Sequence, residues 1–159
     1  MNVVDILKDG HPPVEKSLQN LSESDWEVGS VCGDWSVKDI LAHLASYEHL
    51  LKEVLGTFLE MHETPTLQEY TQNWDNFNDD QVEQRRKMTP AAIWEEYNET
   101  HADIIQLAAR IPPETFRENG TIPWYVEESC LDDLIVYIYA HKWEHVAQIN
   151  VFRDKLAHT

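Results

Sequence analysis

Glycine and cysteine are both scarce in this sequence, and each shortage excludes a class of protein. Of the 159 residues only 5 are glycine, and the turn dipeptides are too few for an all-β sandwich. The two cysteines, Cys32 and Cys130, form neither a CxxC motif nor a disulfide framework. Both thiols are therefore expected to be reduced, as in a cytoplasmic protein.

Basic side chains are scarce as well. Lysine and arginine together number 12 against 29 acidic residues, which gives a formal net charge of -17 at pH 7. A surface this negative repels nucleic acid phosphates and anionic membranes, so neither is expected as a partner. No apolar run approaches the roughly 20 residues of a membrane span, and residues 1–8 do not resemble a secretory signal. We expect a soluble, cytoplasmic protein.

The sequence is rich in apolar residues at helical spacing. The periodic segments cover residues 37–60, 67–87, 90–110 and 131–156. Two of them begin with a capping pattern, Ser36 followed by Asp39 and Ser129 followed by Asp132. The sequence therefore predicts one all-α domain over residues 1–159, arranged as a four-helix bundle.

Three parts of this bundle are expected to be irregular, one of which is the third helix over residues 67–87. Gly10, Pro12 and Pro13 interrupt the first apolar segment, so an irregular N-terminal helix should resume near Pro12 and run to Leu21. Residues 119–125 contain Asn-Gly and Ile-Pro turn signals, which predict a short loop or hairpin before the last helix.

Three histidines fall on the apolar faces of predicted helices. His141 and His145 are four residues apart, so in a helix both imidazoles lie on one face, one turn apart. Ile138 shares that face, which directs both rings into the core. His43 occupies the same kind of position on its own helix, three residues after Ile40.

Three imidazoles in a helical core are costly unless they are satisfied, and one divalent metal ion bound by His43, His141 and His145 removes that cost. Three nitrogen ligands with an open position are also the composition of a reactive zinc-type site. The alternative is that each is an ordinary core histidine, bonded to a tyrosine, a glutamate or a backbone carbonyl. The sequence identifies no further catalytic or cofactor-binding residue.

The remaining histidines are weaker candidates. His101 also lies on an apolar face and is the best alternative ligand, whereas His49 lies six residues from His43 and points away from it. The others are expected in loops or at the terminus: His11, His62 and His158.

A few further side chains leave two interpretations open. Glu48 and Glu144 could orient imidazoles, but both suit a surface charge better. Tyr47 and Tyr137 could hydrogen-bond in the site or only pack in the core. Cys130 falls in the first turn of the last helix, where the helix dipole lowers a thiol pKa; its acidic neighbours oppose this effect, which favours an inert thiol.

Two motifs resemble a known family. Residues 33–44, GDWSVKDILAHL, resemble the second-helix signature of the DinB/YfiT-like superfamily. Residues 139–149, YAHKWEHVAQI, are similar to its last-helix H-x-x-x-H signature. The order of the motifs and the chain length also match, and the middle of the chain looks closest to the four-helix members described as ClbS/DfsB-like.

This resemblance implies a four-helix bundle, usually dimeric, with a three-histidine site for zinc or nickel. The family's first ligand lies eight residues after the Trp of the second-helix motif, which is His43 here, and the other two are the paired His141 and His145. Characterised members include isomerases and transferases that use mycothiol or bacillithiol, and a cyclopropane hydrolase that acts on a genotoxin. The extra C-terminal domain of the mycothiol-dependent isomerases is missing, so isomerase activity is not expected.

The leading hypothesis is a metal-dependent, thiol-dependent transferase or hydrolase that acts on a small electrophilic molecule. Its cofactors would be zinc or nickel and a low-molecular-weight thiol, and its assembly a homodimer. The alternative is a non-catalytic ligand-binding or stress-response bundle with a structural or incidental metal. A third hypothesis is a metal-free enzyme with Cys130 as its nucleophile.

Overall fold

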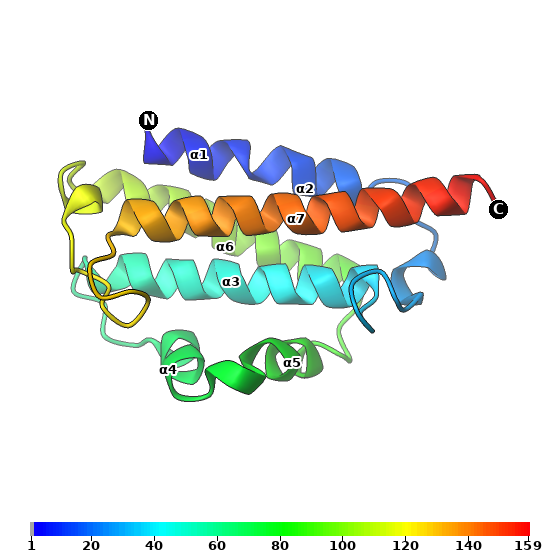
Figure 1. Ribbon diagram of the computed structural model, residues 1–159, viewed down its shortest axis with the longest axis horizontal. Coiled ribbons are helices and arrows are strands. Elements are labelled where there is room, and N and C mark those ends of the chain that lie inside the picture. Colours follow the sequence, from blue (N-terminus) through cyan, green and yellow to red (C-terminus); the bar gives the residue numbers. More distant parts are fainter. Residues whose placement is uncertain (1) are drawn as a thin grey trace.

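The computed structural model describes residues 2–159, and the regular structure of that part is helical (Figure 1). Residue 1, the first of the predicted domain, lies outside the described residues. The long helices are α3 (Val37–Thr57), α6 (Pro90–Arg110) and α7 (Leu131–Ala157). The short ones are α1 (Val3–Asp9), α2 (His11–Ser17), α4 (Pro65–Gln72) and α5 (Trp74–Gln84), with single turns η1 (Asp25–Glu27) and η2 (Thr115–Arg117). The prediction of an all-α fold is confirmed.

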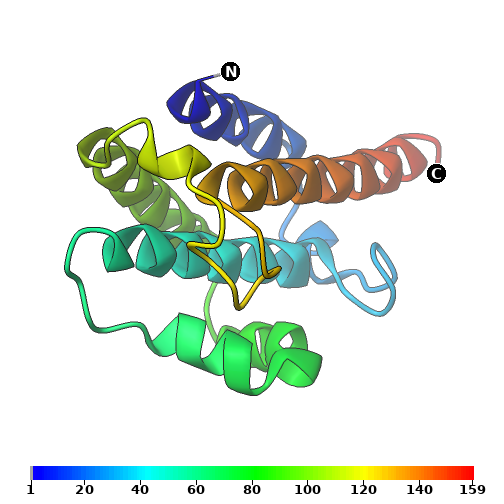
Figure 2. The same ribbon diagram turned by 60° about the vertical axis from the view of Figure 1, so that its left-hand side comes forward.

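The three long helices lie side by side, and α1 and α2 follow one another in a line along α7 (Figures 1 and 2). Helix α3 contacts both α6 and α7, and α4 and α5 lie outside it, against α3. The chain runs in opposite directions in α3 and α7 (Figure 1), so the two helices that carry the predicted histidine ligands are antiparallel neighbours. Within residues 2–159 no helix combines the length and apolar character of a membrane span.

The N-terminal irregularity is a change of helix at Gly10. This residue ends α1 and precedes α2, and Pro12 and Pro13 occupy the first turn of α2, where no intrahelical N–H is needed. A Cβ atom at Gly10 would lie 3.2 Å from Cδ2 of Tyr139, so glycine allows α7 to approach closely. The predicted irregular N-terminal helix is confirmed, although α2 ends at Ser17.

The segment over residues 67–87, for which a partly irregular third helix is predicted, is divided into two short helices. It belongs to α4 and α5, which are separated at Asn73, where the backbone is not helical (φ -138°, ψ 40°). Tyr70 of α4 and Phe77 of α5 both pack into the same apolar cluster, while most other side chains of the segment are exposed. Each short helix turns one apolar face inward, so the helical spacing of apolar residues continues across the break. The spacing therefore does not show where the break lies.

The segment before α7 is a loop, and its predicted hairpin is not formed, since none of residues 118–130 lies in a strand. The cap of α7 is also one residue later than predicted. Cys130 is the N-cap residue, and the Asp133 carboxylate accepts hydrogen bonds from its backbone N–H at 3.0 Å and its Sγ at 3.3 Å. The predicted Ser129–Asp132 pair has the same spacing and is wrong, because sequence spacing alone does not separate two adjacent candidate pairs.

The core consists of two apolar clusters with polar side chains near their junction. One cluster contains the first part of α3, including Ile40 and Leu41, and the second half of α7, including Val146. The other contains the second half of α3 and the first part of α7. Several residues near this junction are buried although they are polar: His43, Glu48, His101, Lys142 and His145. Burial of the two apolar clusters stabilises the fold. The buried polar side chains lie in the layer between the two clusters.

The capping box at the start of α3 generates a stability prediction. Ser36 Oγ accepts from the Asp39 N–H at 3.2 Å, and the Asp39 carboxylate accepts from the Ser36 N–H at 2.9 Å. Replacing Ser36 with alanine should lower the free energy of unfolding by about 1 kcal/mol, measured by urea denaturation. Thr64→Ala is the matched control, because Thr64 precedes α4 without a side-chain cap bond. Equal losses in the two variants would contradict this account.

Candidate metal centre

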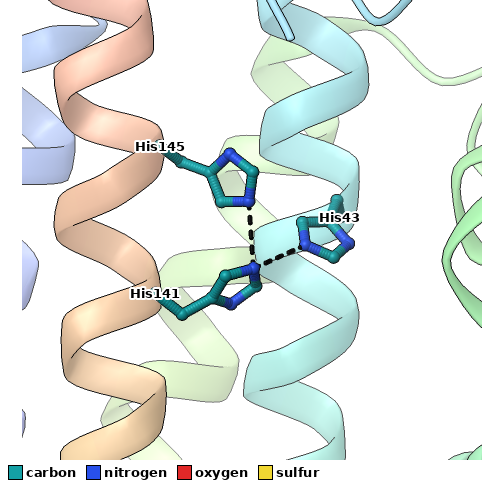
Figure 3. A group of neighbouring side chains, drawn as sticks. All are labelled: His43, His141 and His145. Carbon is teal, nitrogen blue, oxygen red and sulfur yellow. Dashed lines mark hydrogen bonds between the residues drawn. The ribbon is translucent and has the colours of Figure 1, made fainter. Parts of the chain in front are cut away.

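His43, His141 and His145 meet in the interior between α3 and α7 (Figure 3). His141 and His145 lie one turn apart on α7 and point towards α3, from which His43 points back (Figure 3). Nε2 of His141 lies 2.9 Å from Nε2 of His43 and 3.0 Å from Nε2 of His145. The structure therefore brings together all three of the residues that the sequence singles out, and this group could hold a metal ion.

Burial keeps these imidazoles neutral. His43 is 2% exposed and His145 is 5% exposed. Loss of solvation, followed by the neighbouring histidines, lowers the pKa of His43 to about 2, and loss of solvation is also the main cause that lowers the pKa of His141 to about 4. Burial lowers the pKa of His145 too, against the opposing effect of its Gln148 hydrogen bond. Neutral imidazoles present nitrogen lone pairs, which is the form that binds metals.

Gln148 fixes the proton of one ring. Its Oε1 lies 2.8 Å from His145 Nδ1, so Nδ1 carries the hydrogen and Nε2 of His145 presents a lone pair. Nε2 of a neutral His141 carries at most one hydrogen. This hydrogen can form a good hydrogen bond with Nε2 of His43 or with Nε2 of His145, but not with both. Every neutral arrangement therefore leaves one close pair of nitrogens without a good hydrogen bond between them.

A cation resolves this conflict, so the residues fit a metal. The Nδ1 atoms of His43 and His141 are buried and have no hydrogen-bond partner among the described residues. Their rings are positioned by packing instead, with Trp35 4.9 Å and Tyr47 4.9 Å from His43 between ring centroids. Metal–nitrogen bonds of about 2.0–2.1 Å place neighbouring ligand nitrogens about 3 Å apart. Two of the three nitrogen pairs, both with His141, already have this spacing, and all three ligand atoms lie within 4.8 Å of one another.

Other histidines have partners elsewhere and lie outside the three-histidine group. Nδ1 of His101, the best alternative ligand by sequence, lies 2.8 Å from a carboxylate oxygen of Glu48. His49 contacts Glu96 at 2.8 Å. His11 is the first residue of α2 rather than part of a loop, and its Nε2 bonds to a side chain of α6.

Glu48 corrects the sequence interpretation, because it is fully buried and not a surface charge. Lys142 Nζ lies 2.5 Å from Glu48 Oε1, in a buried ion pair. Burial raises the pKa of Glu48, but Lys142 and His101 outweigh this effect and hold the pKa below its usual value. Since Lys142 follows His141 and Glu48 shares α3 with His43, the ion pair joins the two helices beside the centre.

Two tyrosines pack against the centre. The ring of Tyr47 lies 4.8 Å from that of His141, and the ring of Tyr137 stacks on His141 at 5.9 Å. Tyr47 donates a long hydrogen bond of 3.3 Å to Asn78 Oδ1. Burial raises the pKa of Tyr47 well above its usual value, and Tyr137 and Tyr70 raise it further. Both tyrosines thus pack on the imidazoles, and the Tyr47 phenol stays protonated.

Two residues that the sequence interpretation did not name shape this region. Gln148 lies three residues after His145, and i,i+3 spacing from a predicted ligand is the signal that could have found it. Lys142 had no such signal, because a lysine is rarely buried. Glu144 is exposed, as expected, and Cys130 contacts Asp133 at the start of α7, outside the three-histidine group.

The lowered histidine pKa values generate a pH prediction for the metal-free protein. The unfolded chain binds protons on these histidines near pH 6.5, whereas burial lowers the pKa of each of them in the folded chain, to about 2 for His43 and about 4 for His141. The free energy of unfolding should therefore be highest above about pH 7 and fall as the pH drops from 6.5 towards 5, by up to about 1.4 kcal/mol per pH unit for each histidine.

Urea titrations at several pH values check this expectation. Glu48 and Glu96 also have lowered pKa values, but their contribution is lost only below about pH 4.5, so the window from 7 to 5 reports on histidine. His43→Leu removes one of these titrating groups. It should therefore reduce the slope of the unfolding free energy against pH by up to about 1.4 kcal/mol per pH unit, which corresponds to one proton. A wild-type stability that does not change between pH 7 and 5 would contradict the neutral buried set.

Comparison with known proteins places the chain in a family. No curated protein and no solved structure matches it. The sequence profile of the DinB superfamily matches residues 12–149, a span that contains α3 and all three histidines of the centre. This span is most of the chain, and its two histidine-bearing motifs are the ones on which the resemblance was based. The protein belongs to the DinB superfamily.

Proposed function

We propose that this protein is a metal-dependent enzyme in which His43, His141 and His145 hold one divalent ion, zinc or nickel. The observation that carries the proposal is the gathering of their Nε2 atoms, with contacts of 2.9 and 3.0 Å, in a buried layer that offers no complete set of hydrogen bonds. Three imidazole ligands are a composition that leaves coordination positions open for a small molecule.

The chemistry follows from this ligand set. When bound, a divalent ion lowers the pKa of a coordinated thiol or water and so supplies a nucleophile at neutral pH. We infer thiol transfer or hydrolysis of a small electrophilic molecule, with a low-molecular-weight thiol as the co-substrate. The family resemblance favours transfer. The histidines hold the centre, Gln148 keeps the His145 proton on Nδ1, and Tyr47 and Tyr137 border the place where a ligand would lie.

We infer a homodimer in the cytoplasm. Helix α7 carries exposed apolar side chains along its outer side: Val136 at 46%, Trp143 at 42% and Val151 at 54% exposure. Residues seven to eight apart lie on one helix face, and a continuous apolar face suits a symmetric contact between two copies. We also infer that α1 and α2 together take the place of the fourth helix of the bundle.

Metal loading and activity test the proposed function together. The purified protein should contain about one zinc or nickel per chain by mass spectrometry, and His43→Ala should lower metal affinity by more than about 100-fold because it removes one of three ligands. His62→Ala, at an exposed histidine outside the group, is the control.

A panel of electrophiles, offered with a low-molecular-weight thiol and in water alone, then reports turnover. Turnover should disappear with a chelator and return when metal is added. Activity that survives complete metal removal would exclude the metalloenzyme. Tight metal binding without any turnover would favour the non-catalytic, ligand-binding bundle.

Gln148 should act as a positioning residue for His145. Gln148→Leu removes the acceptor of the His145 Nδ1 hydrogen, so the tautomer and the ring orientation are no longer fixed. We expect metal affinity to fall by about 10- to 100-fold, measured by competition with a chromogenic chelator. Gln106→Leu, at an exposed position on α6, should leave the affinity unchanged. Equal affinities of Gln148→Leu and wild type would remove Gln148 from this role.

A further inference from the structure

Two tyrosines border the centre on the same side. Tyr47 lies one turn after His43 on α3, and Tyr137 lies one turn before His141 on α7. Because α3 and α7 are antiparallel, these steps lead towards the same end of the molecule (Figure 1). The ring centroids of both tyrosines lie close to that of His141, at 4.8 and 5.9 Å.

Three more aromatic rings join these two tyrosines into a closed circle. Tyr47 contacts Tyr70 of α4 at 6.3 Å, and Tyr70 contacts Trp124 at 5.8 Å. Trp124 contacts Tyr125 at 6.3 Å, and Tyr125 contacts Tyr137 at 5.7 Å. The loop that carries Trp124 and Tyr125 runs beside α3 and α4 in both views (Figures 1 and 2). We call these five residues the aromatic circle; it begins and ends at His141.

The circle is uncharged but rich in hydrogen-bond donors. Four of its members are tyrosines, Tyr47, Tyr70, Tyr125 and Tyr137, whose phenols are protonated at neutral pH. A protonated phenol donates a hydrogen bond to an anion. The Tyr47 hydroxyl donates a long bond to the exposed Asn78 and has the Tyr137 phenol as a further neighbour. An anion that takes the place of Asn78 would receive this hydrogen. Tyr137 is 41% exposed, which opens the circle to solvent.

We propose that the aromatic circle is the ligand-binding surface of the three-histidine centre, and that it selects a monoanion, such as a thiolate, attached to a flat and uncharged group. The Tyr47 hydroxyl donates a hydrogen bond to the anion, and the flat group packs among the rings of the circle, as aromatic side chains favour. A ligand with several charges, such as a phosphate ester, finds no cationic side chain among the members of the circle. This inference rests on the proposed metal centre and adds the class of its ligand.

Thiol binding to the cobalt-loaded protein tests this proposal, read from the sulfur-to-cobalt charge-transfer absorption. The two probes are both thiols, but they differ in the group attached to sulfur. In thiophenol this group is flat and aromatic, and in 2-mercaptoethanol it is not. We expect Tyr47→Phe to lower the affinity for both thiols by about tenfold, because the hydrogen bond from the Tyr47 hydroxyl to the charged sulfur is lost. Trp124 is separated from His141 by two other rings of the circle on either side. Trp124→Leu should weaken the binding of thiophenol at least about threefold more than that of 2-mercaptoethanol.

Tyr139→Phe and Trp74→Leu are the matched controls, because Tyr139 lies outside the circle on α7 and Trp74 is 70% exposed on α5. Neither should change the thiol affinities by more than about twofold. Thiol affinities that stay at the wild-type level in Tyr47→Phe and Trp124→Leu would overturn the proposal. Loss of cobalt from Tyr47→Phe would overturn it too, by showing that Tyr47 supports the histidines instead of the ligand. Failure of the wild type to bind cobalt would instead remove the proposed function.

Discussion

The structure depends on one interaction, the approach of three neutral imidazole nitrogens from two helices inside the core. His141 stands between His43 and His145, with contacts of 2.9 and 3.0 Å, and its single nitrogen cannot satisfy both neighbours by hydrogen bonding. Burial lowers the pKa of all three rings, so protonation does not relieve the conflict near neutral pH. A polar group left in this state costs stability, and a shared cation is the simple way to recover that cost.

The rest of the fold holds these rings in place. The capping box of α3 and the Cys130–Asp133 cap of α7 fix where the two helices begin, and apolar clusters on both sides of the centre hold the helices together. The buried ion pair between Glu48 and Lys142 joins α3 to α7 next to the histidines. Such a pair adds little net stability, but it disfavours registers that would separate the two charges, which suits a site that needs exact helix register.

Much of this could be predicted from the sequence, and the failures have physical causes. The long helices and the inward positions of His43, His141 and His145 follow from apolar periodicity, which the core enforces. The third helix was expected to be partly irregular, but the position of its break at Asn73 could not be predicted, because helical spacing continues across it. Glu48 looked like a surface charge because its partner Lys142 lies 94 positions away in sequence, and only folding brings the two together. The aromatic circle is equally non-local, since its members come from α3, α4, α7 and a loop.

Membership of the DinB superfamily and the geometry of the centre support one account, in which two helices present a nitrogen ligand set. The aromatic circle as the surface that receives the ligand is our proposal. X-ray diffraction from crystals of the metal-loaded protein, with anomalous data on both sides of the metal absorption edge, tests the central claim of this account most directly. We predict one anomalous peak per chain, within about 2.0–2.2 Å of Nε2 of His43, His141 and His145. A peak bound by other residues, or three histidines with no peak between them, would contradict the account.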